Sequence, residues 1–526
     1  MSVGGASFPS RSGRIGSVRF LRVALAADWV WLSAILAVGL LLRVIHLGRE
    51  SLWLDESMCW FYAQRGLRVL WTQVLSIHPP LYFSLLRLWL LFGDSEAALR
   101  SPSVIFGVIA IALTYVLGRQ VVGARTGLLA AALTATSALQ IQYSQEAYSY
   151  ELLTAATVVA SIGLVCVLRA TRTGMRPKPI VCCAYVGGML IALYAHNIAL
   201  LLFAVAGLIG LADIARRRSL RCAATWGALN ALVVAGWRYW MGVVWHQATG
   251  GSGMSSLDWL APPDLTAVVF ALQGLYGEGY VHFLDPISGL IGIVLAFLGA
   301  FFHRRDGLPI AYLVAAVFGI PLAEIAISHL GRPVFMLRTV IWLAPLFFIL
   351  VAAACPRQRI GPAIGAIGLL LAIQLIGVRN YELTTRKPPW REVVERVSAN
   401  ACPGDVMILA PYHTTEGPFS YYIRQHDVQA RVIEAYNGRE QSPGSGMLSF
   451  DFTNLDSRGE SLLSEPRVWI FLDERFTTDA AGFITRLQAQ HAIVENFTIG
   501  IIGHISVRLF AFPGALCPPR NEQSAD

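Results

Sequence analysis

Long apolar segments recur along most of the chain and are separated by short polar segments. Each approaches the roughly 17–25 residues that an α-helix needs to cross a hydrocarbon core. The pattern therefore predicts roughly 11 membrane-spanning helices, while a shorter segment at residues 264–276 is expected to be re-entrant. The predicted spans are 25–47, 102–118, 127–142, 152–168, 180–195, 198–212, 222–244, 286–302, 308–328, 339–354 and 361–378.

Basic residues fall on alternate connections between these spans. The outer connection from His246 to Gly289 contains no Lys or Arg. Because cytoplasmic loops are enriched in Lys and Arg, this alternation places the N-terminus in the cytoplasm and the chain after about residue 379 outside. The basic residues of the inner segments are Arg11, Arg14, Arg19, Arg22, Arg119, Arg125, Arg169, Arg172, Arg176, Lys178, Arg216, Arg217, Arg218, Arg221, Arg304, Arg305, Arg357 and Arg359.

The last part of the chain has a different pattern. KPPWREVVERV predicts a helix that starts at prolines, and TTDAAGFITRLQAQ predicts a second helix. VMILA, RVWIFLDE, AIVENFTI and ISVRLFAF read as strands, and the Gly/Ser-rich residues 437–458 as a loop. The predicted organisation is a cytoplasmic tail at 1–22, a transmembrane domain at 23–379 with its first outer loop at 48–100, and an extracytoplasmic α/β domain at 380–526.

Composition agrees with a polytopic, all-α membrane protein that carries this α/β domain. Of 526 residues, 55% are hydrophobic and 14% are charged, and the mean hydropathy is +0.56. A soluble protein needs far more charged surface, which excludes that class. The net charge is 41 − 33 = +8. Its basic excess lies mainly on the inner loops, where it sets orientation, so we expect no nucleic-acid partner.

Eight cysteines are scattered without CxxC spacing, which argues against a zinc or thioredoxin-like site. Cys402 and Cys517 lie near opposite ends of the predicted outer domain. If that compartment is oxidising, a disulfide between them would tie these ends together, and two unpaired thiols are an equally weighted alternative.

Candidate chemistry starts with Asp55 and Glu56, just beyond the outer end of the first span and after Trp53. Carboxylates there face either water or a cavity. In a cavity they could act as a general base or as metal ligands. Solvation is the more common fate of an acidic pair in an outer loop.

Other polar residues gather on the predicted outer side. Ionisable groups at membrane depth are expensive to bury, so their grouping favours function over the ordinary structural role that each would have alone. Arg238, near the outer end of its span, could bind a lipid-linked phosphate or simply extend to the interface. No phosphate-binding loop, nucleophile elbow or metalloprotease motif occurs, so ATP-driven transport and soluble-type hydrolysis lack support. The outer polar residues are His78, Gln142, Gln145, Glu146, Tyr194, His196, Asn197, Glu324, His329, Arg332 and Arg338.

Several segments together resemble a known enzyme family. LWLDES, HPPLYFSLLRLWLLFGDSEAALRSPSV, QYSQEAYSYELL, LIALYAHNIALLL, PVFMLRTVIWLAPL and KPPWREVVERV occur in the order and spacing of glycosyltransferases of family 39 with the GT-C fold. Protein O-mannosyltransferases and lipid A aminoarabinose transferases belong to this group. The resemblance covers most of the chain and is densest from about residue 48 to 205.

The resemblance implies transfer of a sugar from a polyprenyl-phosphate donor to a lipid, glycan or protein acceptor at the outer face of a bacterial-type inner membrane, with inversion. It implies that Asp55 is the general base and that Glu56 supports it or shares a divalent ion with it. Asp55, His78 and Glu146 are the candidate metal ligands. The substrate-binding candidates are His78, Tyr143, Gln145, Glu146, His196, Arg238 and Arg338.

One position departs from the family pattern. Many relatives read YSQEAR, whereas this chain has Tyr148 where the Arg would stand. If that Arg binds phosphate in the relatives, this chain must use another cation, and Arg338 and Arg238 are the candidates. The alternatives are a different donor or reduced activity. A flippase for lipid-linked sugars and a sensor whose outer domain binds a ligand are the competing interpretations.

Overall fold

The computed structural model describes residues 12–517 except 73–77, 250–259, 278–283, 356–360, 385, 437–448, 452–456, 474–480, 500–504 and 516. The predicted loop at 437–458 thus lies largely outside the described residues. The chain forms two compact units. The helical unit comprises Met1–Ile45, Val74–Tyr82 and Arg100–Tyr381. The α/β unit comprises His46–Gln73, Phe83–Leu99 and Glu382–Asp526.

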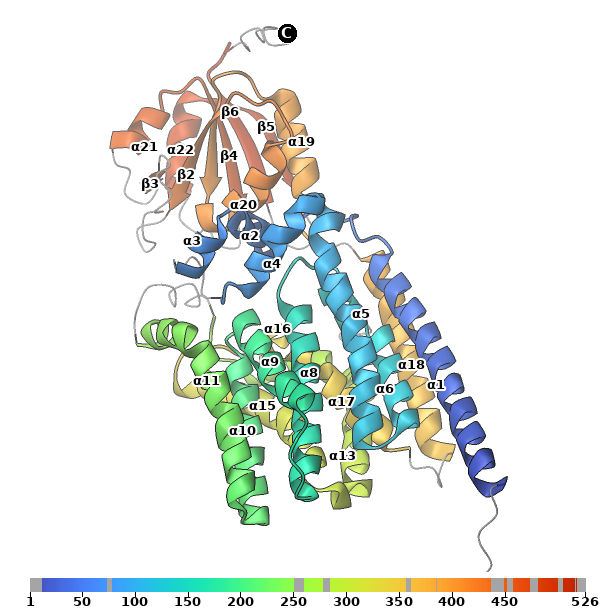
Figure 1. The fold of residues 1–526 in the computed structure, drawn as a ribbon. Coiled ribbons are helices and arrows are strands. Elements are labelled where there is room, and N and C mark those ends of the chain that lie inside the picture. Colours follow the sequence, from blue (N-terminus) through green and yellow to red (C-terminus); the bar gives the residue numbers. More distant parts are fainter. Residues whose placement is uncertain are drawn as a thin grey trace, which may run out of the picture. The chain divides into compact units, whose positions relative to one another are not determined.

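Helices account for nearly all of the helical unit, and most of them coincide with the predicted apolar segments (Figure 1). Six helical segments among the described residues are long and apolar enough to cross a membrane, so the predicted count of eleven is not confirmed. The helices are α1 (Ser12–Val44), α5 (Glu96–Val121), α6 (Ala124–Thr136), α7 (Ala138–Ser144), α8 (Tyr150–Arg172), α9 (Pro179–Ala195), α10 (Ala199–Arg217), α11 (Leu220–Ala248), α12 (Leu265–Gly277), α13 (Asp285–Phe302), α14 (Leu308–Val314), α15 (Ile320–Leu330), α16 (Leu337–Val340), α17 (Ala344–Ala353) and α18 (Gly361–Leu383).

Three of the apolar segments contain a break in the regular α-helix. Segment 127–142 divides into α6 and α7 at Ser137, whose hydroxyl accepts a hydrogen bond from the Gln140 N–H as an N-cap. Segment 308–328 contains one π-helical turn at Ala315–Gly319, between α14 and α15. Segment 339–354 begins with α16 and a 3₁₀ turn before α17. Hydropathy alone does not register such breaks, because both halves remain apolar.

Helices α8 and α9 pack side by side through small residues (Figure 1). A Cβ atom on Gly163 would lie 2.3 Å from the Tyr185 backbone nitrogen, and one on Gly188 would lie 2.5 Å from the Ala160 nitrogen. Only glycine permits backbones to approach this closely, and such small-residue contacts are typical of helix pairs in membranes.

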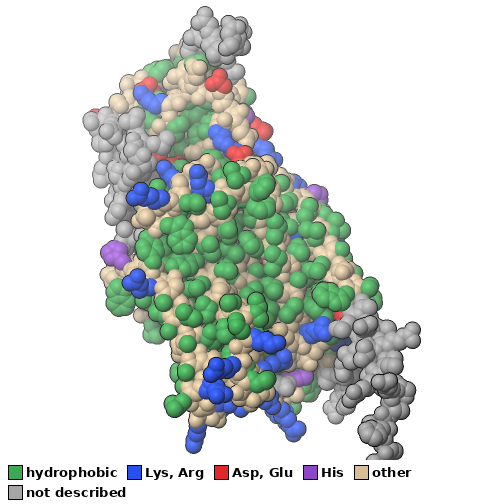
Figure 2. Space-filling model, in the orientation of Figure 1, with side chains coloured by type: hydrophobic (Ala, Val, Ile, Leu, Met, Phe, Trp, Pro, Cys, Tyr) green, Lys and Arg blue, Asp and Glu red, His purple; other side chains and the backbone are tan. Residues whose placement is uncertain are grey.

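The helical unit exposes large apolar side chains, including Leu208, Leu211 and Phe297. Figure 2 shows hydrophobic side chains along the visible flank of this unit and Lys and Arg gathered at one end. Helices α8 and α10 carry basic residues in their last turns, Arg169 and Arg172 on α8 and Arg216 and Arg217 on α10. Apolar patches of this extent mark membrane or partner contact. Together with the long apolar helices, they identify a multi-pass membrane protein.

A six-stranded sheet forms the core of the α/β unit, and this confirms the predicted C-terminal α/β architecture. Its strand order is β3-β2-β1-β4-β6-β5, with β3, β2, β1 and β4 parallel and β6 antiparallel to both β4 and β5. The strands are β1 (Val406–Ala410), β2 (Arg431–Tyr436), β3 (Ser449–Asp451), β4 (Arg467–Asp473), β5 (Ala492–Ile499) and β6 (Ile505–Ala511).

Helices cover both faces of this sheet (Figure 1). On one face, Ile408 and Ile470 pack in a cluster with residues of α21 (Ser457–Leu462) and α22 (Ala481–Gln490). On the other face, the Phe471 ring lies 4.9 Å from Phe419 of α20 (Tyr412–Ile423). Helix α19 (Trp390–Asn400) lies on that second face too, because its Arg396 covers the Phe497 ring, and Phe497 is in register with Phe471 across β6.

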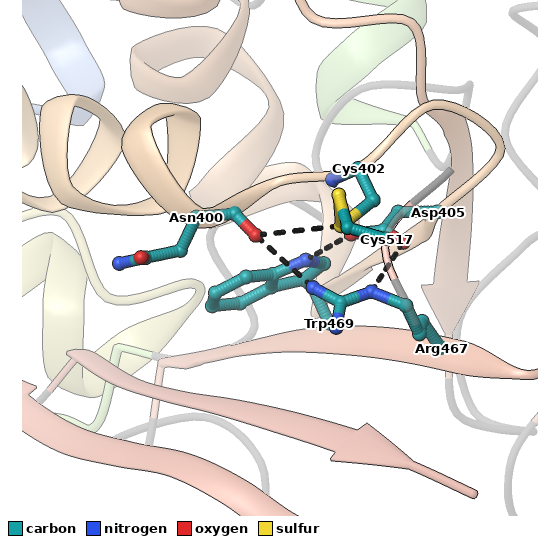
Figure 3. The surroundings of a disulfide bond; sticks show 6 residues. All are labelled: Asn400, Cys402, Asp405, Arg467, Trp469 and Cys517. Carbon is teal, nitrogen blue, oxygen red and sulfur yellow. Dashed lines mark hydrogen bonds and ion pairs between the residues drawn. A yellow bond between two sulfur atoms is a disulfide. The ribbon is translucent and has the colours of Figure 1, made fainter. Parts of the chain in front are cut away.

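A disulfide joins Cys402 to Cys517 (Figure 3). Beside it, the buried carboxylate of Asp405 accepts hydrogen bonds from the Cys402 N–H (2.9 Å), the Arg467 guanidinium (2.8 Å) and the Trp469 indole (2.8 Å). These bonds fasten the turn before β1 to the start of β4. One charged donor and two neutral donors therefore replace the water that the Asp405 carboxylate loses on burial.

Replacement of Asp405 by Ala is expected to destabilise this unit by about 3 kcal/mol, because Arg467 would lose its buried partner. Hydrogen–deuterium exchange of the full chain should show faster exchange of the β1 and β4 amides. The exposed Asp427 offers a matched control, since Asp427→Ala should leave exchange unchanged. Equal exchange in both variants would contradict this role for Asp405.

Candidate active site

Helix α2 (Leu54–Ala63) presents Asp55 at its first turn, in the α/β unit. The helix starts after Trp53, whose backbone is extended, and the N-terminal end of a helix favours negative charge. One side of α2 is buried through Glu56, Ser57, Cys59, Trp60 and Ala63. Asp55 is half-buried instead, and Met58 and Tyr62 follow it at helical spacing on the same side. The carboxylate of Asp55 thus belongs to the more open side of the helix.

Glu56 occupies the opposite environment. Its side chain is fully buried, and one oxygen lies 2.9 Å from the Nζ atom of Lys387, whose side chain is 9% exposed. The sequence predicted Glu56 as a partner of Asp55 in the chemistry, and the structure engages it in an ion pair. Lys387 is not among the residues predicted from the sequence, although it stands directly before the two prolines that open the predicted outer domain.

A second polar group lies within the helical unit and is called the His–Tyr cluster here: His78, Tyr148, Tyr150 and His196. The Tyr148 hydroxyl lies 2.7 Å from His78 Nε2. The His78 and His196 ring centroids are 4.9 Å apart, and Tyr150 stacks on His196 at 5.7 Å. Tyr143 extends the group, with its ring 5.3 Å from that of Tyr150. Three segments far apart in sequence therefore contribute rings to one place.

The His–Tyr cluster is held in an uncharged state next to one cation. Burial is the main cause that lowers the pKa of His196, to about 4, and the positive charge of Arg338 adds to it. Burial, followed by the charges of His196 and Arg338, lowers the pKa of His78 well below its ordinary value. Both imidazoles are therefore neutral at physiological pH. A neutral imidazole can donate one N–H to an anion that Arg338 attracts.

This arrangement predicts a pH-dependent stability. Between about pH 6.5 and the folded pKa of about 4, the unfolded chain binds a proton at His196 that the folded chain does not bind. Stability should therefore rise with pH through this window and be lost as the pH falls, by roughly 3 kcal/mol at most. Thermal unfolding of the full chain at pH 7 and pH 5 should show a smaller difference for His196→Gln than for wild type.

The exposed His329 supplies the control, because His329→Gln removes an imidazole that is not buried. An unchanged pH dependence in His196→Gln, identical to that of His329→Gln, would refute the buried neutral imidazole.

The backbone that carries Tyr148 is fixed by hydrogen bonds. The Ser103 hydroxyl lies 3.2 Å from the Tyr148 carbonyl oxygen, and Tyr82 contacts that hydroxyl at 3.0 Å. Gln145, three residues earlier, donates its amide N–H groups to carbonyl oxygens at the end of α1, including that of Ile45 at 2.8 Å. Its own amide oxygen accepts a 2.6 Å hydrogen bond from Tyr381. Gln145 thus satisfies carbonyls that a helix end leaves open, while its predicted substrate contact stays a prediction.

Glu146 is buried in the same segment, and one of its oxygens accepts a 3.2 Å hydrogen bond from the Gln142 amide. Arg238 differs from the other candidates because its side chain is exposed on α11, next to the buried Trp237. Because Glu146 is buried and Arg238 is exposed, Glu146 is the better candidate for an interior site.

The turn that carries Arg338 is built by polar residues of α15. The fully buried Glu324 accepts a 2.6 Å hydrogen bond from the hydroxyl of Thr339, the residue after Arg338. Ser328, one turn later on α15, accepts hydrogen bonds from the N–H groups of Val334 and Phe335. The π-helical turn before α15 is a feature often found at functional sites. These contacts hold the short helix α16 in one position.

Among the described residues, no three His, Cys, Asp or Glu side chains gather in a group that could hold a metal ion. The metal-binding roles of Asp55, His78 and Glu146 stay predictions.

Comparison with solved structures reveals similarity over nearly the whole chain. ArnT from Cupriavidus metallidurans in the apo state aligns with a TM-score of 0.61 and 11% identity, over 94% of this chain and 100% of that one. ArnT from the same organism bound to undecaprenyl phosphate aligns with a TM-score of 0.54 and 12% identity, over 93% and 99%. The Archaeoglobus fulgidus oligosaccharyltransferase in complex with Zn and sulfate aligns with a TM-score of 0.50 and 12% identity, over 91% and 73%.

The chain has the GT-C fold. Within this GT-C protein, residues 77–240 also match the family described as dolichyl-phosphate-mannose-protein mannosyltransferase. The matched region contains all four residues of the His–Tyr cluster, whereas Asp55 and Arg338 lie outside it. No curated protein sequence matches the chain.

Proposed function

We propose that this GT-C protein transfers a sugar from a polyprenyl-phosphate donor to a lipid, glycan or protein acceptor, at the outer face of a bacterial-type inner membrane. The fold similarity to ArnT, including the form bound to undecaprenyl phosphate, and the match to the mannosyltransferase family support this. The observation that carries the proposal is the His–Tyr cluster beside Arg338. Two neutral imidazoles, His196 buried and His78 half-buried, next to a guanidinium are costly in a membrane protein, and such groups are usually kept for function.

On the donor side, the leaving group is a phosphate that gains negative charge as the bond to the sugar breaks. Arg338 would neutralise this charge, because a guanidinium donates two parallel N–H groups to phosphate oxygens. The neutral His78 and His196 can each donate an N–H without bringing a second charge. Preorganised donors of this kind stabilise developing charge at no cost of reorganisation during the reaction.

On the acceptor side, Asp55 would accept the proton of the attacking hydroxyl. Asp55 lies on the half-buried, more open side of α2, which supports this role, and Glu56 forms an ion pair with Lys387. Attack of the hydroxyl oxygen on the anomeric carbon forms the new glycosidic bond as the sugar–phosphate bond breaks. A single displacement of this kind inverts the anomeric configuration.

Tyr148 takes a different role from the Arg of the family pattern. Its hydroxyl is bonded to His78 Nε2 and orients the imidazole, while its ring packs against Tyr150 at 4.9 Å. The positive charge that the family Arg would supply comes from Arg338 in this proposal, because Arg338 acts electrostatically on both histidines. The exposed Arg238 is the weaker candidate for this role.

The proposal is tested with purified protein in liposomes that contain undecaprenyl phosphate carrying radiolabelled mannose, or a radiolabelled pentose, with extracted cell envelope as the acceptor mixture. A transferase should release undecaprenyl phosphate and move the label to a product of higher mass. Movement of intact labelled lipid between leaflets, without cleavage of the sugar–phosphate bond, would replace the proposal with a flippase. Mass analysis of envelope glycans from a strain that lacks the protein identifies the sugar and the acceptor.

A further inference from the structure

The chain that leads into α2 is held by residues from the C-terminal part of the α/β unit. The guanidinium of Arg391, on α19, donates to the Gly48 carbonyl oxygen at 3.2 Å. The same group forms an ion pair with Glu96 at 2.6 Å. Two residues after Gly48, the carboxylate of Glu50 accepts a 2.7 Å hydrogen bond from the backbone N–H of Arg386. Residues 48–50 are therefore fixed before the helix begins.

The next contact reaches the residue just before the N-cap of α2. The Tyr422 hydroxyl, at the end of α20, accepts a 2.7 Å hydrogen bond from the Leu52 N–H and donates at 3.0 Å to Glu96. Glu96 is also the partner of Arg391, so one carboxylate connects α19 and α20 at this point. Leu52 is fully buried, which leaves this backbone N–H without access to water.

The first turn of α2 is then held on its buried side. Lys387 pairs with the fully buried Glu56 at 2.9 Å. Helix α20 approaches so closely that a Cβ atom on Gly417 would lie 2.8 Å from the Ser57 hydroxyl oxygen. The Trp60 ring meets the Tyr421 ring edge-on at 5.2 Å. These contacts run along one face of α2 and fix its rotation about its own axis.

We propose that Lys387, Arg391 and Tyr422 are positioning residues that set the direction of the Asp55 carboxylate. This inference rests on the proposed function, because it assigns them a role in the transfer that Asp55 performs. Successive residues of a helix point about 100° apart. Holding Glu56 by Lys387 therefore determines where its neighbour Asp55 points. The C-terminal α/β domain then contributes to the transfer reaction by positioning Asp55.

The first experiment is steady-state transfer by the full chain in liposomes, with whichever undecaprenyl-phosphate sugar the wild-type protein uses. A displacement of about 1 Å costs roughly 100-fold in rate, so Lys387→Met should lower kcat by that order. The KM for the donor lipid should stay within about twofold of wild type, because Lys387 is a positioning residue and not a donor contact. Lys387→Arg should recover part of the lost kcat, since it keeps the positive charge.

Arg396 offers a control on α19, the helix that begins three residues after Lys387. It pairs with Glu495 at 3.6 Å and covers Phe497, so it contacts the sheet instead of α2. Like Lys387→Met, Arg396→Met removes one basic group from an ion pair, yet its kcat should remain within about twofold of wild type. An equal loss of kcat in Lys387→Met and Arg396→Met would indicate a general effect on the domain and would overturn the proposal.

A second readout does not depend on activity. Cys59 is buried on the side of α2 that these contacts hold. In a chain that keeps Cys59 and the disulfide, its labelling by a thiol reagent should be slow, and Lys387→Met should speed it by roughly tenfold through local opening. Arg396→Met should leave it slow. The free cysteines to be replaced by Ala are Cys166, Cys182, Cys183, Cys222 and Cys355.

The two readouts separate failure of this inference from failure of the proposed function. If the wild-type chain transfers sugar while Lys387→Met retains full kcat, the positioning role is wrong, whatever the labelling rate. If the wild-type chain transfers no sugar, the proposed function is wrong and the positioning role falls with it. Faster Cys59 labelling together with a lower kcat, in Lys387→Met only, would support the proposal.

Discussion

Replacing Asp55 by Asn is expected to lower the rate of sugar transfer by about 10³-fold, within the roughly 10²–10⁴-fold that a general base contributes. The amide has the shape of the carboxylate but cannot accept the proton of the attacking hydroxyl. Because donor binding depends on other residues in this proposal, the KM for the donor lipid should change little. Measurement of kcat and KM with purified full-length protein checks both expectations.

Two comparisons make this result specific to the base. Glu395 is an exposed carboxylate on α19, and Glu395→Gln should leave kcat unchanged. Raising the pH should partly restore the transfer rate of the Asp55→Asn variant, because the acceptor hydroxyl then loses its proton more readily without a general base. Full transfer by Asp55→Asn at neutral pH would show that the proposed mechanism is wrong.

Replacing Arg338 by Met is expected to lower kcat by roughly 10²–10³-fold, the usual effect of removing one donor to a developing charge. Arg338→Lys should be intermediate, because an ammonium keeps the charge but cannot form the two parallel bonds of a guanidinium. The loss should appear in kcat more than in donor KM, because charge on the phosphate grows as the sugar leaves. Transfer kinetics in liposomes measure both constants.

A second consequence concerns His196. The charge of Arg338 lowers the pKa of this imidazole together with burial, so Arg338→Met should raise that pKa and weaken the loss of stability between pH 7 and pH 5. The exposed Arg332, in the loop before α16, serves as the control for both measurements. If Arg332→Met and Arg338→Met behaved alike, the phosphate would have to be bound elsewhere.

Much of the fold could be predicted from local patterns. The apolar segments became helices because an apolar stretch without internal breakers satisfies its backbone only as a helix in a membrane. The strands VMILA, RVWIFLDE, AIVENFTI and ISVRLFAF are confirmed, because buried strands have a strong local signal. The breaks at Ser137 and at the π-helical turn were not predicted, because neither interrupts the apolar pattern of its segment.

The candidate site could be predicted only in part. Asp55, His78, His196 and Arg338 were selected from the sequence, because charges and imidazoles stand out in so apolar a chain. The bond between Tyr148 and His78 could not be predicted, since 70 residues separate them and no local pattern encodes their contact. The same holds for Lys387, which lies 331 residues from Glu56.

Local sequence patterns were enough to predict a membrane protein with apolar helices and a C-terminal α/β domain. Periodicity and hydropathy follow from how each segment meets water or lipid, and that is a property of neighbouring residues. Which polar side chains meet depends instead on the tertiary packing. It placed Glu56 in an ion pair and Asp55 on the open side of α2, although the two are adjacent in sequence. The physical reason is that the charge state and direction of a side chain depend on burial and partners, which long-range packing alone supplies.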